Sequence, residues 1–329
     1  MLNFQGDIYD RYKFEYNKFV SGVRTKCYDQ LADSVVYESA IATLLRYNST
    51  QKSEQIFLVV PSIFNSPEIL FLNEGRNFIS NLQEKGDVYL VNWQENTSPL
   101  VLEDYINELQ TIILLFGKKE HRDINLIGHC IGGTMCIAAA SQTLMLSSLT
   151  LLTCPWDYSH FRKWTQASQL LVLDEVIAGF EFIPKIYTQI MFFLMFPLQF
   201  KDKILKYFSL ESVEKKELFM KVEEWLGSGI AISKTVYRQI IQDFCQSNTP
   251  ANNQWFVNGQ LVTLEKLNIP VCIIYASDDQ IVPFSSIDPL QKTIKDSTLI
   301  EVNGGHISYL VNGDANFYTQ YNGWLKQVI

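Results

Sequence analysis

The chain has 329 residues, of which 47% are hydrophobic and 19% are charged. This composition is typical of a globular protein, and a chain of this length can bury a large core. Its net charge of −8, without any basic cluster, argues against nucleic acid as a partner, because phosphates would be repelled. The six cysteines lack zinc-binding spacing, and the chain is too large for a disulfide scaffold, so we expect free thiols in a reducing compartment.

The N-terminal segment MLNFQGDIYDRYKF carries charges and contains no apolar run, which predicts that it is not a signal peptide. The longest apolar stretch runs from Ile186 to Phe200, and Gln189, Pro197 and Gln199 interrupt it. A transmembrane helix needs about 20 consecutive apolar residues, so no membrane span is predicted. Together these features predict a cytoplasmic protein.

Strand and helix patterns alternate in the first half of the chain. The run QIFLVV at Gln55–Val60 is typical of a strand buried on both faces. Further strands are expected at Val88–Trp93, Asn125–Ile127 and Leu149–Thr153, and helices at Asn73–Glu84, Leu102–Phe116 and Ile131–Leu144. This alternation predicts a parallel sheet with right-handed crossovers.

The pattern changes between Trp156 and Val262, where strand runs give way to helical segments rich in Phe, Leu and Met. Alternation resumes with strands at Val271–Ala276 and Leu299–Val302 and helices near Ser286–Ile294 and Ala315–Val328. We therefore predict an α/β core made of residues 1–155 and 263–329, with a helical cap at 156–262. The first 50 residues are expected to form a helical segment that wraps the sheet.

A candidate nucleophile lies between an expected strand and the helix that follows it. Gly128-His129-Cys130-Ile131-Gly132 has the G-x-nucleophile-x-G form of the elbow in α/β-hydrolases, with cysteine as the nucleophile. The N-terminus of the helix favours the thiolate of Cys130 and an oxyanion beside it. Alone, this short pattern also fits a buried structural cysteine, which is our expectation for the other five cysteines.

Two backbone N–H groups are expected to stabilise that oxyanion. The first belongs to Ile131, which directly follows the nucleophile. The second should come from the loop after Val60. Since Pro61 has no N–H, Ser62 and Ile63 are the candidates.

The order of residues along the chain predicts the acid and the base. In α/β-hydrolases both follow the nucleophile, with the acid before the histidine. His306 lies just past the last expected strand, where the base belongs, whereas His160 lies at the start of the cap and is expected to be solvated. Asp278 and Asp279 both follow the strand before it, at the carboxyl edge where such sheets place their sites. The residues alone leave both aspartates open.

The other two histidines are expected to be structural. His129 flanks the nucleophile, and its side chain is expected to point away and pack. His121 lies in the charged segment KKEHRD and is expected at the surface.

At these motifs the sequence resembles the polyhydroxyalkanoate synthase family, over roughly residues 55 to 312. The motifs that carry the resemblance are VPSIFNSP (60–67), VNW (91–93), GHCIGGT (128–134), LLTCPWDY (151–158), DQIVP (279–283), GHI (305–307) and VN (311–312). The resemblance places Cys130, Asp279 and His306 at the catalytic positions, as nucleophile, acid and base. It therefore favours Asp279 over Asp278.

The chain also departs from the family pattern. Gln280 follows the aspartate where histidine is usual, and Glu68 and Phe71 stand where tyrosine and aspartate are usual. The W-x-x-D pattern of the cap keeps Trp225 but has Ser228 in the acidic place. The length resembles that of the short synthases, which act with a second, smaller subunit.

The resemblance implies transfer of a 3-hydroxyacyl group from coenzyme A to Cys130 and elongation of a polyester. It implies no metal and no cofactor besides the coenzyme A thioester substrate. The implied partners are a second synthase subunit or a second copy of the chain, and the surface of a polyester granule. Two alternatives stay open: a cysteine-dependent thioesterase or ester hydrolase with the same triad, and a non-catalytic granule-associated subunit.

The cap contains a run of large apolar residues. Phe192, Phe193 and Phe196 are candidates for lining a polyester channel or keeping water from the acyl-enzyme, although such a run also fits the packed face of a helix. A cap over the carboxyl edge of the sheet predicts that Cys130 is largely buried until the cap moves.

Overall fold

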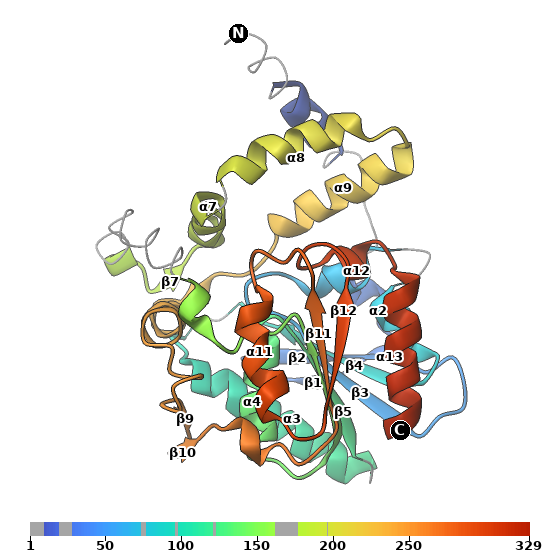
Figure 1. The fold of residues 1–329 in the computed structure, drawn as a ribbon, viewed down its shortest axis with the longest axis vertical. Coiled ribbons are helices and arrows are strands. Elements are labelled where there is room, and N and C mark those ends of the chain that lie inside the picture. Colours follow the sequence, from blue (N-terminus) through green and yellow to red (C-terminus); the bar gives the residue numbers. More distant parts are fainter. Residues whose placement is uncertain are drawn as a thin grey trace.

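An eight-stranded sheet forms the centre of the described part of the chain (Figure 1). A computed structural model describes residues 10–19, 28–73, 77–95, 98–120, 123–161, 177–195 and 197–329. In sheet order the strands are β1 (Ser34–Glu38), β2 (Ala42–Tyr47), β4 (Gly86–Trp93), β3 (Gln55–Val60), β5 (Ile124–His129), β6 (Leu146–Leu152), β11 (Val271–Ala276) and β12 (Ser297–Val302).

Most of this sheet is parallel. The six strands from β4 to β12 run in one direction, whereas β2 pairs antiparallel with β4 and β1 pairs antiparallel with β2. In β3 every residue after Gln55 is buried, as a strand covered on both faces requires. The predicted parallel α/β sheet is confirmed.

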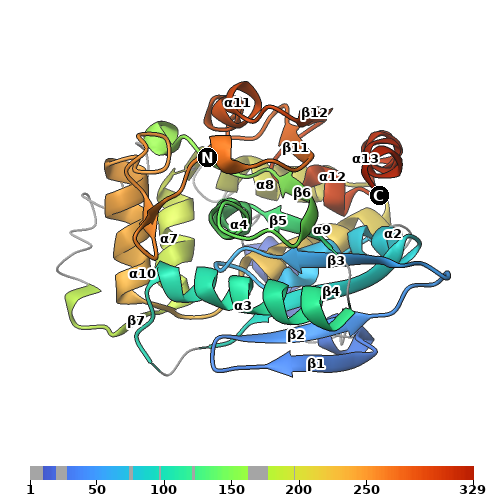
Figure 2. The ribbon, with the colours of Figure 1, turned by 90° about the horizontal axis from the view of Figure 1, so that it is seen from below.

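Helices cover both faces of the sheet (Figure 2). On one face the apolar core contains α3 (Leu102–Glu120), α4 (Ile131–Ala140) and α11 (Phe284–Thr293). On the other face it contains α2 (Phe78–Gln83) and α13 (Ala315–Val328). Each face therefore buries its own apolar cluster, as expected when strands and crossover helices alternate.

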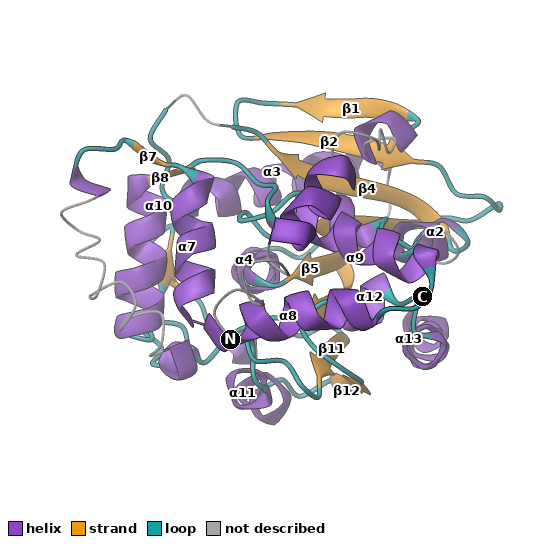
Figure 3. Ribbon diagram, turned by 90° about the horizontal axis from the view of Figure 1, so that it is seen from above, coloured by secondary structure: helices purple, strands orange, loops and turns teal. Residues whose placement is uncertain are grey.

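The described residues between β6 and β11 are mostly helical. Its helices are α7 (Lys185–Met195), α8 (Pro197–Ser209), α9 (Val213–Leu226), α10 (Lys234–Arg238) and the π-helix η4 (Gln239–Gln246). The sequence did not predict the short strand pairs in this part, which are β7 (Phe182–Ile183) with β8 (Ile232–Ser233) and β9 (Phe256–Val257) with β10 (Gln260–Leu261). α8 and α9 lie over the end of the sheet toward which β11 and β12 point (Figures 1 and 3).

Short helices connect these elements. They are the 3₁₀ helices η1 (Tyr28–Leu31), η2 (Pro67–Leu70), η3 (Tyr158–Phe161) and η5 (Leu264–Lys266), and the single-turn α12 (Ser308–Val311). None of the helices within the described ranges is both long and apolar enough to span a membrane.

The expectation that the first 50 residues form a helical wrap is wrong in two respects. Residues 34–38 form strand β1 and residues 42–47 form strand β2. Pairing with the distant strand β4 buries most of β2. The helix at residues 10–19 packs on the cap, where Tyr12 lies in one apolar cluster with Tyr207 of α8 and Met220 of α9.

Candidate active site

Cys130 occupies a sharp turn between β5 and α4. Its φ of 55° and ψ of −130° are unfavourable for a residue with a side chain, and such a conformation persists only where its surroundings enforce it. The Cys130 N–H donates to the carbonyl oxygen of Leu152 in β6, 2.9 Å away. The nucleophile candidate therefore lies at the carboxyl end of β5, directly before the first residue of α4, as an elbow requires.

Close backbone contacts explain the two glycines of the motif. A Cβ on Gly132 would lie 2.5 Å from the carbonyl oxygen of Pro61, and a Cβ on Gly128 would clash with Cα of Gly133. Only glycine allows both approaches. The contact at Gly132 also brings the loop after β3 against the start of α4, which is where the predicted oxyanion donors lie.

The structure places the predicted acid and base in direct contact. Asp279 follows β11 and His306 follows β12, two neighbouring parallel strands. Oδ2 of Asp279 lies 2.7 Å from Nδ1 of His306, and this carboxylate is completely buried. Asp278 is exposed. Of the two aspartates that the residues left open, Asp279 is therefore the one that orients the imidazole.

The surroundings of His306 raise the pKa of its imidazole from 6.5 to about 10. Burial acts in the opposite direction because it disfavours the charged ring, but the carboxylate of Asp279 and the thiol of Cys130 outweigh it. Asp279 and Cys130 also act on the ring through side-chain hydrogen bonds. The arrangement therefore favours the protonated, imidazolium form of His306.

A strained threonine supports the histidine loop. Thr153, directly after β6, has φ 42°, a conformation that is rare for a β-branched residue. Its hydroxyl donates to the backbone carbonyl of His306 at 3.4 Å. No local sequence pattern singles out this residue, because its role depends on a contact between segments 153 positions apart.

The two predicted oxyanion donors flank the elbow. Ile131 is the first residue of α4, where backbone N–H groups have no partner within the helix. Ser62 is only 6% exposed, and its hydroxyl accepts the N–H of Phe64 at 3.1 Å. Trp93 fixes the same loop through a 3.1 Å bond from its indole N–H to the carbonyl oxygen of Pro61. The assignment of Ile131 and Ser62 stays a prediction.

The other histidines differ from His306. His129 does not point away from the site as expected: it is buried, and its ring centroid lies 5.5 Å from that of His306. Burial, followed by the charge of His306, lowers the pKa of His129 to about 3, so this ring stays neutral. His160 is exposed, and His121 lies outside the described residues.

The remaining cysteines resemble packed apolar residues. Cys136, Cys154, Cys245 and Cys272 are free and buried, and burial raises the pKa of each thiol, in the case of Cys245 to about 12. Cys27 lies outside the described residues. No group of three potential metal ligands occurs in the part of the chain that the structure describes.

Two predictions concern the cap: the role of its phenylalanines and the burial of Cys130. Phe196 and the side chains of Phe192 and Phe193 lie outside the described residues. Cys130 is intermediate in exposure, so it is neither fully buried nor open at the surface, and the expectation that it stays largely buried until the cap moves stays a prediction.

The end of α9 is bonded to the loop after β3. The indole N–H of Trp225 donates to the carbonyl oxygen of Ser66 at 2.7 Å, and the hydroxyl groups of Ser66 and Ser228 lie 3.0 Å apart. Gly229, with φ 122°, approaches the carbonyl of Phe64 so closely that a Cβ would clash. We call these contacts the cap–loop latch. It joins the cap to the segment that carries Ser62.

Three departures from the family pattern lie around this latch and the acid. Phe71 packs against the ring of Tyr47 at a centroid distance of 5.4 Å, so it serves the core. Burial raises the pKa of the Glu68 carboxyl, which accepts from the hydroxyl of Ser66 at 3.3 Å. Gln280 is exposed beside the buried Asp279. None of the three alters the contact between Asp279 and His306.

Comparisons with known proteins relate this site to a family. No protein-family model matches the chain. The chain is 28% identical over 326 residues to the poly(3-hydroxyalkanoate) polymerase subunit PhaC of Haloarcula marismortui, which covers 91% of this chain and 68% of that protein. It is 29% identical over 299 residues to the subunit PhaC of Haloferax mediterranei, which covers 85% of this chain and 60% of that protein. The prediction of an acyltransferase-type enzyme agrees with these names.

Solved structures relate the chain to a fold. MenH from S. aureus superimposes with a TM-score of 0.53 at 16% identity, covering 86% of this chain and 98% of that chain. The α/β-hydrolase GrgF from Penicillium sp. superimposes with a TM-score of 0.55 at 15% identity, covering 87% and 94%. At such identities the likeness shows the fold alone. The chain thus has the α/β-hydrolase fold and is a homologue of the poly(3-hydroxyalkanoate) polymerase subunits named PhaC.

Proposed function

We propose that this chain is an acyltransferase that moves 3-hydroxyacyl groups from coenzyme A to Cys130 and joins them into a polyester. The observation that carries the proposal is the arrangement of Cys130, His306 and Asp279 at the carboxyl edge of the sheet, with 2.7 Å between the last two. The names of the homologues support the polymerase chemistry.

In the loading step the thiolate of Cys130 attacks the carbonyl carbon of the acyl-CoA thioester. The C–S bond to coenzyme A breaks, and the departing thiolate takes a proton from the imidazolium of His306. One thioester replaces another, so the step is nearly balanced in free energy and does not trap the acyl group. The N–H groups of Ile131 and Ser62 stabilise the oxyanion of the intermediate.

In the elongation step neutral His306 removes the proton of a 3-hydroxyl group, whose oxygen attacks the acyl group on Cys130. An ester C–O bond forms, the C–S bond to Cys130 breaks, and the thiolate–imidazolium pair is restored. Asp279 holds Nδ1, which leaves Nε2 of the same ring for this proton exchange.

One observation favours a second candidate function, a cysteine-dependent thioesterase or ester hydrolase. The same triad serves both reactions, and only the exclusion of water from the acyl-enzyme separates them. Cys130 is intermediate in exposure and therefore not fully enclosed. A non-catalytic granule-associated subunit is disfavoured, because such a subunit has no need of a buried carboxylate bonded to His306.

The test is to incubate the purified chain with 3-hydroxybutyryl-CoA and to measure free coenzyme A, free acid and insoluble polymer together. Coenzyme A release with polymer supports the synthase. Coenzyme A release with an equal amount of free 3-hydroxybutyrate supports the hydrolase. The assay is repeated with a second synthase subunit and with polyester granules added, and no product under any condition supports the non-catalytic role.

A further inference from the structure

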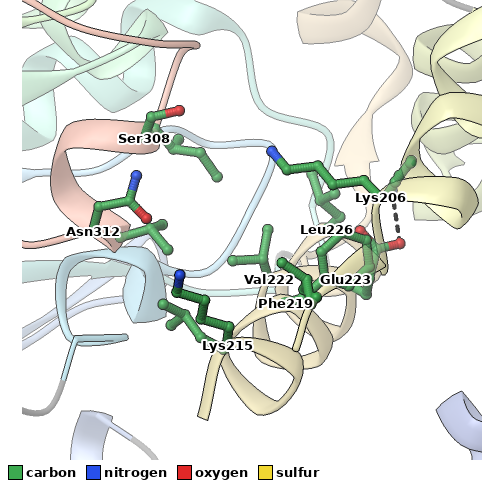
Figure 4. Close-up of a pocket in the computed structure, with 13 residues that line it drawn as sticks. Lys206, Lys215, Phe219, Val222, Glu223, Leu226, Ser308 and Asn312 are labelled. Atoms are coloured by element: carbon green, nitrogen blue, oxygen red, sulfur yellow. Dashed lines mark ion pairs between the residues drawn. The ribbon is translucent and has the colours of Figure 1, made fainter. Parts of the chain in front are cut away.

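A cavity lies beside the histidine loop, apart from the catalytic residues. Its volume is about 550 Å³, within the range of roughly 300–1,000 Å³ that small-molecule sites occupy. α8, α9 and α12 form its walls (Figure 4). Ile307, the residue directly after His306, is part of the lining.

The lining combines apolar side chains with an excess of cations. Lys203, Lys206 and Lys215 line the cavity, and Glu223 is the acidic residue among them. The Glu223 carboxylate already accepts a hydrogen bond from Tyr12 at 3.0 Å and forms an ion pair with Lys203 at 2.7 Å. Lys206 and Lys215 form no ion pair with any residue that the structure describes.

The two unpaired ammonium groups face the same space. Figure 4 shows Lys206 and Lys215 extending toward the gap between α9 and the polar side chains of Ser308 in α12 and Asn312 directly after it. Phe219 and Val222 supply apolar surface on the α9 side. In a chain whose net charge is −8, this is a local positive site that attracts an anion with an apolar part.

We propose that this cavity binds the phosphorylated nucleotide end of the coenzyme A thioester. The inference rests on the proposed function and assigns the substrate a second binding region besides Cys130. Lysine binds phosphate as a point charge, and the apolar wall suits the base and the neutral arm of the cofactor. The polyester product carries no charge along its length, so the two lysines favour the substrate and not the product.

The test compares two thioesters of the same acid. One is 3-hydroxybutyryl-CoA, and the other is the N-acetylcysteamine thioester, which lacks the nucleotide and its phosphates. In Lys206→Met/Lys215→Met the KM for the coenzyme A thioester should rise about tenfold, since each exposed ion pair contributes up to about 1 kcal/mol. The KM for the short thioester and both kcat values should stay unchanged.

The matched control is Lys216→Met, which removes the same charge from α9. Lys216 does not line the cavity, and its ammonium lies 5.8 Å from the centre of the Tyr207 ring. The KM values of the Lys216→Met variant for both thioesters should stay within about twofold of the wild type, as for most substitutions away from a binding site. Equal changes for both thioesters, or no change in the double variant, overturn the inference.

A binding measurement separates this inference from the proposed function. Calorimetry with free coenzyme A should show binding to the wild-type chain and about tenfold weaker binding to the double variant. If neither thioester is turned over, the proposed function fails, yet this loss of binding still supports the cavity as a coenzyme A site. If the wild-type chain does not bind coenzyme A, or the double variant binds it equally well, the inference is wrong.

Discussion

Oδ2 of Asp279 lies 2.7 Å from Nδ1 of His306, while Oδ1 of the same carboxylate accepts the backbone N–H groups of Ile281 at 2.8 Å and Val282 at 2.9 Å. Both oxygens of the carboxylate are therefore engaged. The backbone bonds fix the direction of the carboxylate, and the carboxylate fixes the ring. The base is held in its working orientation without any contribution from substrate.

Replacing this carboxylate should disable the base. Asp279→Asn is expected to lower kcat for acyl transfer about 1,000-fold or more, because the amide stabilises the wrong tautomer of His306 and not its charged form. The measurement is coenzyme A release from 3-hydroxybutyryl-CoA. Asp278→Asn, the same change at the exposed neighbour, should stay within about twofold of the wild type. The reverse ranking of the two variants contradicts the assignment.

The raised pKa of His306 predicts how stability depends on pH. A group whose pKa is higher in the folded state stabilises the fold fully below its unfolded value of 6.5, and this contribution is lost as pH rises through about 10. Asp279→Asn removes the largest of the groups that raise this pKa. The difference in the free energy of unfolding between wild type and variant should therefore shrink from pH 6 to pH 10. Urea unfolding of both proteins at each pH measures this difference in the free energy of unfolding. A difference that stays constant from about pH 6 to about pH 10 excludes the raised pKa of His306.

The cap–loop latch should matter for both stability and turnover. Trp225→Phe keeps an aromatic ring but removes the N–H that reaches the carbonyl of Ser66. We expect a loss of about 1–2 kcal/mol in the free energy of unfolding and a fall in kcat that exceeds any change in KM, because the freed loop carries Ser62.

Trp324→Phe is the matched control for this variant. Trp324 is buried in the same apolar cluster as Trp225, but it lies on α13, where it stacks on Tyr321 at a centroid distance of 6.0 Å and takes no part in the latch. The Trp324→Phe variant should lose a similar amount of free energy of unfolding, while its kcat should equal that of the wild type. Equal losses of kcat in both variants would show that the latch acts only through overall stability.

Much of the α/β core could be predicted from the sequence because its strands are buried on both faces. The strand Val271–Ala276 and the helix Ala315–Val328 have the predicted bounds. β1 and β2 were missed because they form an antiparallel edge, whose pairing with β4 is a contact between distant segments. The two-residue strands of the cap are too short to leave a periodic pattern.

The candidate site also has a part that could be predicted from the sequence and a part that only the folded chain reveals. Cys130 and His306 could be predicted because the elbow motif and the order of the triad are local and sequential signals. The support of the His306 loop by Thr153, the approach of His129 to His306 and the bond between Trp225 and Ser66 could not. Each joins segments that only the folded chain brings together. The cavity lined by Lys206 and Lys215 likewise depends on how α9 packs beside α12.

The most direct test of the account is to locate the acyl group. Purified chain is mixed with a limiting amount of 3-hydroxybutyryl-CoA, quenched in acid, digested and examined by mass spectrometry. The account predicts a 3-hydroxybutyryl thioester on the peptide that contains Cys130, retained in Cys245→Ala and absent in Cys130→Ala, which also releases no coenzyme A. An acyl group on any other cysteine, or coenzyme A release that persists in Cys130→Ala, would contradict it.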